Sequence, residues 1–458
     1  MSEPSKPDQP GDRSPVDTPE LPPGPRGLPV VGNTHQLMWD PRSFYATLAE
    51  YGDVVRYQVA GNQFCTLLHP DYIERVLLHD HEKFRKWQFE EVGVEFASEG
   101  LFLTDGEQWE RQRTLLQEAF TVDRIQSYGS AAVEYTRQQV GSWNEGERIA
   151  LNEAARELTL RILTDSLFNI DIDDGRRGDV IQSFTAALNR RGSTRQPSAF
   201  LPDWVPTPAN RRYKAAKSDL EAMLEELIAT RRETGGNADD LLSILITAED
   251  NGTTLTEREI RDQLITFLFA GHETTALALA YTWLLLSIHP GKQQKLREEL
   301  DRVLGDDDPT MVDLPALEYT EQVIKESLRL YPPAYVIFRE AAEDIRIGGY
   351  RIPAGTKVTL PQFHVHMDDR FYDTPDAFRP ERWTDDRTAD RPEYAYFPFG
   401  GGPRHCIGMR FAMMELKTMI ATMAQRVDFE LCSDPEPSVR MAATLRPASD
   451  IEMRVRKR

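Results

Sequence analysis

The stretch Phe399-Gly400-Gly401-Gly402-Pro403-Arg404-His405-Cys406-Ile407-Gly408 places one cysteine between a glycine-rich loop and a helix expected over about residues 407–426. Glycines let such a loop turn tightly and let a flat ligand approach its backbone. A helix N-terminus favours a thiolate over a thiol, and a thiolate can ligate a soft metal centre such as haem iron. Arg404 supplies a charge that can pair with a carboxylate of that ligand. The stretch therefore predicts a cofactor site centred on Cys406.

Cys406 also admits plainer interpretations. A lone cysteine is usually a small buried hydrophobe. A catalytic nucleophile with His405 as its base is a second interpretation, although side chains adjacent in sequence rarely face each other. A phosphate-binding loop does not fit, because it needs a Lys followed by Ser or Thr where this chain has Cys406 and Ile407.

A long apolar helix is expected upstream of this loop. Residues 264–288 are apolar apart from His272 and Glu273, a capping box begins at Thr256, and a His-Pro pair follows the segment. The pattern predicts a helix of about 32 residues, roughly 48 Å long.

The length of this helix also suits a membrane span. A span would place Glu273 near the bilayer centre at a cost of ~3 kcal/mol, and no basic cluster marks a cytoplasmic end. We therefore expect no transmembrane anchor but the central helix of a large soluble protein, apolar on all sides. Glu273 and Thr274 are costly in an apolar core unless they serve a function. A hydrogen bond from Thr274 to the carbonyl four residues earlier would open the helix locally and leave a groove.

The composition excludes several classes of protein. The 458 residues include 54 Lys and Arg against 74 Asp and Glu, a net charge of −20 that repels nucleic-acid phosphates and anionic lipid. Three cysteines cannot form a disulfide framework, which suits a reducing, cytoplasmic compartment. Only 11 of the basic residues are Lys. This preference for Arg over Lys has two interpretations. One is a haloarchaeal cytoplasm at molar salt, where the Debye length is only ~3 Å. The other is an ordinary acidic enzyme from a high-GC genome.

The chain is expected to comprise a tail and one domain. Residues 1–20 are acidic and rich in Pro and should be disordered, and residues 21–458 contain no linker that divides them. Helical patterns dominate from residue 105 onward. A small sheet should combine early strands, at 54–59 and 64–68 with a turn at Gly61-Asn62, and late strands at 335–339, 344–347, 350–352 and 357–360. The predicted fold class is mainly α with a small β region.

Five patterns in the chain, taken in order, resemble those of the cytochrome P450 monooxygenases. The stretch around Cys406 fits the family's haem loop, F-x-x-G-x-R-x-C-x-G. Residues 270–275 (AGHETT) fit the oxygen-binding pattern of its central helix. The other three are W-x-x-x-R at 109–113, E-x-x-R at 326–329, and the Pro-Glu-Arg-Phe element at 380–383, with Trp in place of Phe. The resemblance covers about residues 21–458 and implies the helical prism of that family with its long central helix.

The resemblance also implies roles for the matched residues. Cys406 would be the axial thiolate ligand of a haem b iron, and the catalytic pair Glu273 and Thr274 would deliver protons during oxygen activation. The haem propionates would be held by a set of cationic and indole groups, namely Arg404, Arg339, Arg113 and Trp109.

A structural network is implied behind the haem loop. Glu326 and Arg329 lie three residues apart on one helix and share a face, and the resemblance adds Arg382 to them. The spacing alone also allows a surface ion pair worth ~0.3 kcal/mol. His364 and His366 lack a third ligand nearby and are expected to be structural.

The implied activity is a haem-thiolate monooxygenase that hydroxylates an organic substrate with one atom of O₂. No G-x-G-x-x-G follows a strand, so electrons should come from a separate ferredoxin with its reductase. A peroxygenase and a haem-based sensor are the alternatives. The retained pair Glu273–Thr274 counts against both.

The substrate is expected to be apolar. Alignment with the family places pocket-lining segments at about 87–102, 265–271, 334–338 and 442–445. They carry the side chains Trp87, Phe89, Phe96, Phe102, Phe267, Val336, Ile337 and Phe338. Such a lining suits a lipid, a terpenoid or a polyketide.

Overall fold

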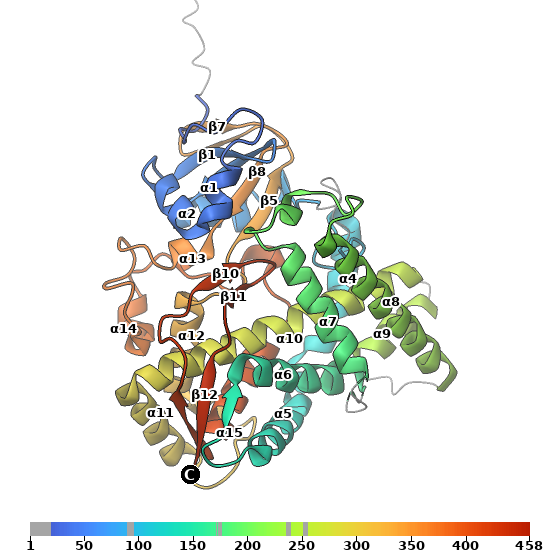
Figure 1. Cartoon of the computed structure of the whole chain (residues 1–458), viewed down its shortest axis with the longest axis vertical. Helices are drawn as coiled ribbons and strands as arrows, with labels where there is room; N and C mark the ends of the chain where they lie inside the picture. Colours follow the sequence, from blue (N-terminus) through green and yellow to red (C-terminus); the bar gives the residue numbers. More distant parts are fainter. Residues whose placement is uncertain (1–19, 89–95, 171, 173–175, 235–239, 251–254) are drawn as a thin grey trace, which may run out of the picture.

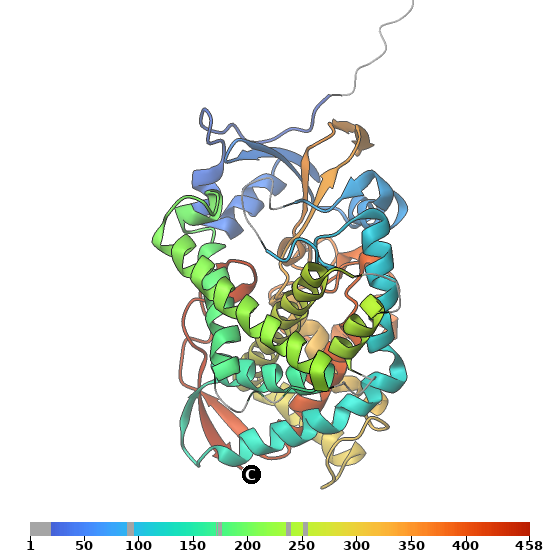
Figure 2. The same ribbon diagram turned by 90° about the vertical axis from the view of Figure 1, so that its right-hand side faces the viewer.

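Helices form the body of the molecule, and the larger β-sheet lies at one end of it (Figure 1). The computed structural model describes residues 20–88, 96–170, 172, 176–234, 240–250 and 255–458. Turned by 90°, the molecule shows helices from the middle of the chain layered over one another on one side (Figure 2). The predicted mainly α fold with a small β region is confirmed. The predicted tail lies outside the described residues except for Glu20.

The helices run along the chain as follows: α1 (Thr34–Trp39), α2 (Pro41–Ala49), α3 (Pro70–Glu74), α4 (Gly106–Leu116), α5 (Val122–Ser142), α6 (Leu151–Phe168), α7 (Arg176–Arg191), α8 (Pro208–Thr234), α9 (Leu241–Asp250), α10 (Glu257–Ile288), α11 (Pro290–Val303), α12 (Glu318–Leu330), α13 (Gln362–Val365), α14 (Asp385–Thr388) and α15 (Met409–Ala424).

The central helix is α10, whose 32 residues match the predicted length. The Thr256 hydroxyl accepts the N–H of Glu259 (3.1 Å), and the Glu259 carboxylate accepts the N–H of Thr256 (2.8 Å), so the capping box is confirmed. The helix packs against α6, α12 and α15. Among the described residues it is the one helix long and apolar enough to cross a membrane, but most of that apolar stretch is buried inside the protein. It is therefore a core helix, as predicted.

The β region combines early and late parts of the chain, as predicted. Its largest sheet has the order β1-β2-β8-β5-β3, and a three-stranded sheet has the order β4-β12-β9. Two hairpins, β6-β7 and β10-β11, complete it. The strands are β1 (Val54–Val59), β2 (Asn62–Leu67), β3 (Phe84–Arg85), β4 (Arg148–Ala150), β5 (Ile337–Ala341), β6 (Ile345–Ile347), β7 (Tyr350–Ile352), β8 (Lys357–Leu360), β9 (Val427–Leu431), β10 (Val439–Met441), β11 (Leu445–Pro447) and β12 (Glu452–Lys457).

Three strands have bounds that differ from the prediction: β2 covers 62–67 rather than 64–68, β5 covers 337–341 rather than 335–339, and β6 begins at 345 rather than at 344. Val59 pairs with Asn62, so the turn is Ala60-Gly61, and both of its residues have positive φ (48° and 85°). The expected turn at Gly61-Asn62 was one residue late, because Asn62 already belongs to β2. Strand β5 begins at Ile337 rather than at 335, since the carbonyl oxygen of Tyr335 accepts the N–H of Phe363 in α13 (3.2 Å) instead of pairing with a strand.

The large negative charge predicts a stability that depends on salt. Repulsion among exposed carboxylates destabilises the folded state, and salt screens it. We expect the melting temperature, followed by haem absorbance, to rise steadily from dilute buffer to about 3 M KCl. A melting temperature that stays level or falls over this range would remove the halophilic interpretation and leave the fold and the site unaffected.

Candidate active site

The loop before α15 holds Cys406 in a tightly packed turn. Gly402 has φ +63°, and a Cβ at this position would lie 1.8 Å from the carbonyl oxygen of Leu77, so only glycine fits. The N–H of Cys406 donates to the carbonyl oxygen of Phe399 (2.8 Å) and closes the loop. The loop therefore presents the Cys406 side chain at a fixed point.

The pKa of Cys406 is shifted in the opposite direction to the one that a helix N-terminus predicts. The protein atoms packed around the loop desolvate the Cys406 thiol and raise its pKa even though the side chain borders accessible space, while the N–H of Gly408 and the charge of Arg113 lower it by less. The helix end contributes through Gly408, but desolvation outweighs it. The thiolate form needs a further positive charge next to the sulfur, which a metal ion would supply.

The face of α10 toward this loop is accessible in the middle of an otherwise buried helix. Phe267, Ala270 and Thr274 share one helix face. Phe267 stacks on Phe120 (ring centroids 5.6 Å apart), and the Phe120 ring lies beside Gly408 of the loop. Ala270 is exposed and Thr274 half-buried, and the Cys406 side chain is accessible too. We call the space between this face and Cys406 the cofactor slot.

Thr274 makes the hydrogen bond that the sequence suggested. Its hydroxyl donates to the carbonyl oxygen of Ala270 (2.6 Å). The helix nevertheless continues without a break from Glu257 to Ile288. The accessible space therefore comes from the small side chain of Ala270 rather than from an opened turn.

Two arginines, Arg404 and Arg339, lie at one edge of the slot. Arg404 forms an ion pair with Asp105, donates to the carbonyl oxygen of Thr104 (2.8 Å), and lies over the Trp109 ring at 4.4 Å. Arg339 is buried and donates to the carbonyl oxygen of Phe338 (2.9 Å).

A third cation, Lys86, joins Arg404 and Arg339, and no sequence pattern pointed to it. Burial and the neighbouring Arg404 lower the pKa of Arg339 to about 10, and Asp105 opposes the shift. Burial lowers the pKa of Lys86 well below its ordinary value, with repulsion from Arg339 and Arg404 adding to it. Three cations thus share one carboxylate among the described residues around them. This excess of charge fits the two propionates of a haem, so the residues present fit the group that the sequence implies.

Arg113 lies on the same side of the molecule as the loop. Its guanidinium donates to the carbonyl oxygen of His405 (3.0 Å) and lies 3.4 Å from the ring nitrogen Nε2 of that residue. Arg113 therefore ties α4 to the loop and brings its charge near the sulfur of Cys406.

Glu273 is fully buried beside Thr274 and is held by three polar groups. Arg156 Nε lies 3.1 Å from its carboxylate, Asn189 Nδ2 lies 3.2 Å away, and the Thr444 hydroxyl lies 3.3 Å away. Arg156 also binds Glu153 (2.5 Å), whose side chain is about half exposed. A continuous polar chain therefore connects Glu273 with the surface of α6. The sequence did not single out these partners, since they come from α6, α7 and the β10–β11 hairpin.

A second buried carboxyl lies near the slot. Glu415 on α15 contacts Thr275, and burial raises its pKa well above 4.5. Burial therefore favours the neutral form of this side chain. No sequence pattern distinguished it from an ordinary helical Glu.

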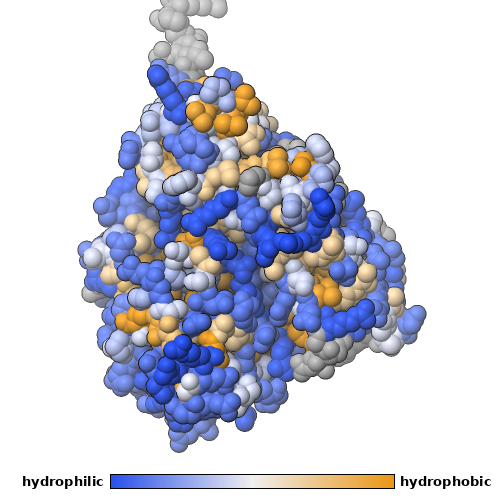
Figure 3. Space-filling view, viewed as in Figure 1, coloured by the Kyte–Doolittle hydropathy of each residue, from blue (hydrophilic) through white to orange (hydrophobic). Residues whose placement is uncertain are grey.

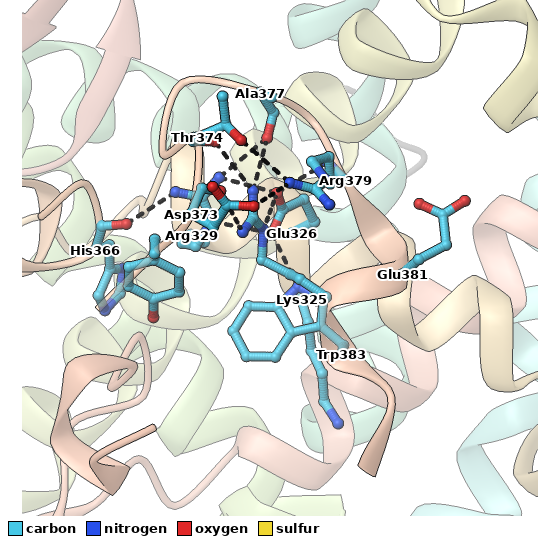
Figure 4. Close-up of polar contacts among 12 residues, drawn as sticks. Lys325, Glu326, Arg329, His366, Asp373, Thr374, Ala377, Arg379, Glu381 and Trp383 are labelled. Atoms are coloured by element: carbon cyan, nitrogen blue, oxygen red, sulfur yellow. Dashed lines mark hydrogen bonds and ion pairs between the residues drawn. The ribbon is translucent and has the colours of Figure 1, made fainter. Parts of the chain in front are cut away.

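The predicted network behind the loop is present as an arrangement of buried ions (Figure 4). The two oxygens of Glu326 accept hydrogen bonds from Arg329 Nε and Nη2 (both 2.9 Å) and from Arg382 Nε (2.8 Å). Backbone carbonyls of His366, Asp373, Thr374 and Ala377 accept the remaining N–H groups of the two arginines. Because all three side chains are buried, the surface ion-pair alternative is wrong for Glu326 and Arg329.

Trp383 adds a donor that the family pattern did not predict. Its indole N–H donates to Glu326 Oε2 (3.0 Å), an interaction that the usual Phe at this position cannot make. The substitution of Trp for Phe thus brings another donor to Glu326, besides the N–H of Arg379 (3.0 Å). Of the two histidines, His366 accepts the N–H of Phe397 (3.0 Å) through Nε2 and is structural, as expected.

Trp383→Phe should weaken the fold without removing the cofactor. A hydrogen bond to a charged group is worth about 1.5–3 kcal/mol, so we expect a loss of about that size in the free energy of unfolding. Urea unfolding of the holoprotein measures it, with the exposed Trp39→Phe as the control. Equal midpoints for the two variants would show that the indole N–H contributes nothing.

Several expected pocket residues lie elsewhere or outside the described residues. Phe267 stacks on Phe120 at the Cys406 side of the slot. Phe96 is buried against Phe184 and Phe269, and Phe89 lies outside the described residues. Val336, Ile337 and Phe338 are half-buried, which leaves their side chains in part accessible.

Comparison with known proteins assigns the family. A family model described as Cytochrome P450 matches residues 22–455. This chain belongs to the cytochrome P450 family. The P450 is similar to cyclooctat-9-en-7-ol 5-monooxygenase of Streptomyces melanosporofaciens, with 34% identity over 407 residues and 88% of each chain covered.

Two further relatives are also named as an oxygenase or a hydroxylase. Pentalenene oxygenase of Streptomyces avermitilis is 33% identical over 423 residues, covering 92% of this chain and 93% of the relative. Cytokinin hydroxylase of Arabidopsis thaliana is 31% identical over 393 residues, covering 83% and 76%. This P450 is accordingly a haem-thiolate monooxygenase that uses O₂, an organic substrate and a redox partner. Its haem, when bound, supplies the oxygen activation that lets one atom of O₂ enter the substrate.

Proposed function

We propose that this P450 hydroxylates an apolar, terpenoid-sized substrate in the cofactor slot, with Cys406 as the axial ligand of a haem b. The observation that carries the proposal is the slot itself, with Cys406 and the accessible residues Ala270 and Thr274 inside the domain. The excess of positive charge at the edge of the slot supports a cofactor whose propionates lie at that edge.

Each cationic residue has a proposed task in holding the cofactor. Arg339, Arg404 and Lys86 bind the propionates, and Trp109 adds its indole N–H while its ring supports the guanidinium of Arg404. Arg113 contacts the loop at His405 and acts electrostatically on both Arg404 and Cys406, so it can bind a propionate and also favour the thiolate of Cys406. The Glu326–Arg329–Arg382 network keeps the wall behind the loop rigid.

Glu273 and Thr274 are the proposed route for protons. Arg156 holds Glu273 at one end and the half-exposed Glu153 at the other. Release of the Arg156–Glu273 contact lets the carboxylate turn toward the slot with a proton taken up from the solvent side. The Thr274 hydroxyl, at the accessible face of α10, then orients that proton toward the substrate space. A peroxygenase or a haem-based sensor does not need such a chain of proton-transferring groups.

An apolar substrate is supported by the half-buried side chains at the start of β5, Val336, Ile337 and Phe338. The names of two relatives, a cyclooctatenol monooxygenase and a pentalenene oxygenase, point the same way. We propose a ferredoxin with its reductase as the electron donor, and the cytoplasm as the location, because the chain has no flavin or nucleotide fingerprint and only three scattered cysteines.

A spectroscopic screen tests the substrate class. Apolar terpenoids, fatty acids and polar compounds of equal size are added to the purified holoprotein, and the Soret band is followed. We expect a shift from low spin to high spin with terpenoids, because a fitting apolar ligand displaces water from the slot. Shifts confined to polar or charged compounds would contradict the proposed substrate class.

Thr274→Ala should separate electron use from product formation. General acid–base groups typically contribute a factor of 10² or more, so we expect product per NAD(P)H to fall by about tenfold or more, with peroxide released instead. Haem content and substrate-induced spectra should be unchanged. The matched control is Thr282→Ala, which removes an equivalent hydrogen bond to Ala278 two turns along α10. Equal coupling in both variants would remove Thr274 from the route.

A further inference from the structure

Two arginines lie directly opposite each other on the β10–β11 hairpin. Arg440 of β10 is the register partner of Arg446 of β11, and like charges opposite each other on paired strands are destabilising. Arg440 is exposed and Arg446 is partly buried, and neither side chain forms a hydrogen bond or an ion pair with the part of the chain that the structure describes. Residues 438–448 contain no acidic residue. We call Arg440 and Arg446 the arginine pair, whose two charges repel each other unless an anion lies between them.

The carboxylates that act on Arg446 are already engaged by another arginine. Glu273 and Glu153 both contact Arg156, at 3.1 and 2.5 Å. Burial lowers the pKa of Arg446, the charge of Glu273 opposes this shift, and repulsion from Arg156 adds to it. The arginine pair therefore has no carboxylate of its own among the described residues.

The hairpin has an apolar face and a basic face, because side chains alternate along a strand. Met441 and Leu445 lie opposite each other and belong to a buried hydrophobic cluster, against which Phe338 packs. The residues next to them in each strand, Arg440 and Arg446, are on the other face. The apolar face thus fixes the hairpin in the core and leaves the arginine pair on the opposite side.

The basic face of the hairpin continues to the active site. Thr444, two residues before Arg446, belongs to the same face. Its hydroxyl lies 3.3 Å from the carboxylate of Glu273, the neighbour of Thr274 in the cofactor slot. At a rise of ~3.3 Å per residue, the arginine pair lies about 7 Å along the strand from that contact. A ligand that extends from the slot along this face therefore reaches the pair.

The arginine pair is also accessible from solvent, beside the C-terminal end of α7. The N–H of Thr194, just after α7, donates to the carbonyl oxygen of Met441 (3.1 Å) and joins the two segments. Arg190 in the last turn of α7 is exposed and adds a further positive charge. Figure 1 draws the hairpin in front of the helices, and in the space-filling view of the same face dark blue side chains lie around the middle of the molecule, where the hairpin is drawn (Figure 3).

The local charge of this region is opposite to that of the whole protein. A net charge of −20 repels anions at long range. At physiological salt the Debye length is ~8 Å, so an anion that has reached the hairpin meets the arginines rather than the distant carboxylates. Direct contact with the pair, and not attraction by the protein as a whole, decides whether an anion binds.

We propose that the arginine pair binds the oxyanion end of the substrate, so that this P450 acts on an amphipathic acid with an apolar, terpenoid-sized body. The apolar body occupies the slot beneath the hairpin tip, and the two guanidinium groups donate to the oxyanion, a geometry that suits carboxylates. This inference rests on the proposed function and narrows its substrate class. A free anion from solvent shares the same binding chemistry, and the experiment separates the two sources.

Soret titration of the full-length holoprotein with farnesoic acid and with its methyl ester tests the proposal. The two compounds share one apolar skeleton and differ in charge. We expect both to shift the band, with the acid binding about tenfold more tightly at low salt, because hydrogen bonds to a charged group are worth about that factor. The difference should shrink at high salt. If neither compound shifts the band, the proposed apolar substrate class fails, whereas equal affinities overturn the arginine-pair inference alone.

Substitutions locate the anion site. Arg440→Gln/Arg446→Gln should weaken acid binding about tenfold and leave the ester unchanged, and Arg440→Gln alone, at an exposed position, should give part of that loss. The matched control is Arg148→Gln/Arg302→Gln, which removes two exposed charges from β4 and α11 and should bind both compounds normally. Unchanged acid binding in the test variants, or an equal loss in the control, would overturn the proposal. An intact carbon monoxide spectrum in each variant shows that the haem site is retained.

Acetate, added at constant ionic strength, distinguishes a free anion from the substrate's own. It should compete with farnesoic acid and leave the ester titration unchanged, because it occupies the position of the carboxylate. If acetate instead alters the titration of both compounds, and the acid has no advantage over the ester, the arginine pair takes a free anion and its role in substrate recognition is overturned.

Discussion

Cys406→Ser should abolish the thiolate-type Soret band of the reduced carbon monoxide complex. A hydroxyl is a far poorer donor to iron than a thiolate, and desolvation by the surrounding protein already disfavours the anion of Cys406. We expect a complete loss of the long-wavelength band and of product formation. The closed loop around Phe399 and Cys406 is held by backbone hydrogen bonds, so it should survive the substitution.

The control for this variant is Cys432→Ser, because Cys432 is a half-buried cysteine away from the loop whose thiol lies 3.6 Å from the carbonyl oxygen of Glu430. It should keep the band in full. Persistence of the band in Cys406→Ser would mean that another residue is the axial ligand.

Glu326→Gln should have the largest effect on stability. The carboxylate accepts hydrogen bonds from Arg329, Arg382 and Trp383, and it is the charge that both buried guanidinium groups face. Its neutralisation leaves two cations in the core, and the loss of one partner of a buried ion pair costs about 3–5 kcal/mol. We expect poor haem retention and a correspondingly lower free energy of unfolding in urea.

A matched variant lies at the start of the same helix. Glu318 is exposed in the first turn of α12, and Glu318→Gln should change stability by only a few tenths of a kcal/mol. If Glu326→Gln unfolded at the same urea concentration as this control, the network would not be the support of the loop that we describe.

The sequence predicted the elements whose local signals are strong. The capping box at Thr256 and the apolar run after it predicted α10 to its full length, and the i,i+3 pair Glu326–Arg329 lies on α12 as expected. The turn at residue 60 was displaced by one residue, because hairpin register depends on cross-strand pairing that a single strand does not reveal.

Site residues that only tertiary packing brings together could not be predicted from local sequence patterns. Lys86, Arg156 and Asn189 are ordinary polar residues in sequence, and only the fold places them beside Arg339 or Glu273.

The central claim is that this chain inserts one atom of dioxygen into an apolar substrate at the slot beside Cys406. Its most direct test is mass spectrometry of the product formed under isotopically heavy dioxygen. The assay contains the holoprotein, NAD(P)H, a ferredoxin with its reductase, and the compound that gives the largest Soret shift. We predict a hydroxylated product that carries one heavy oxygen atom and depends on NAD(P)H. A product without NAD(P)H, or a hydroxyl group whose oxygen comes from water, would contradict the assignment.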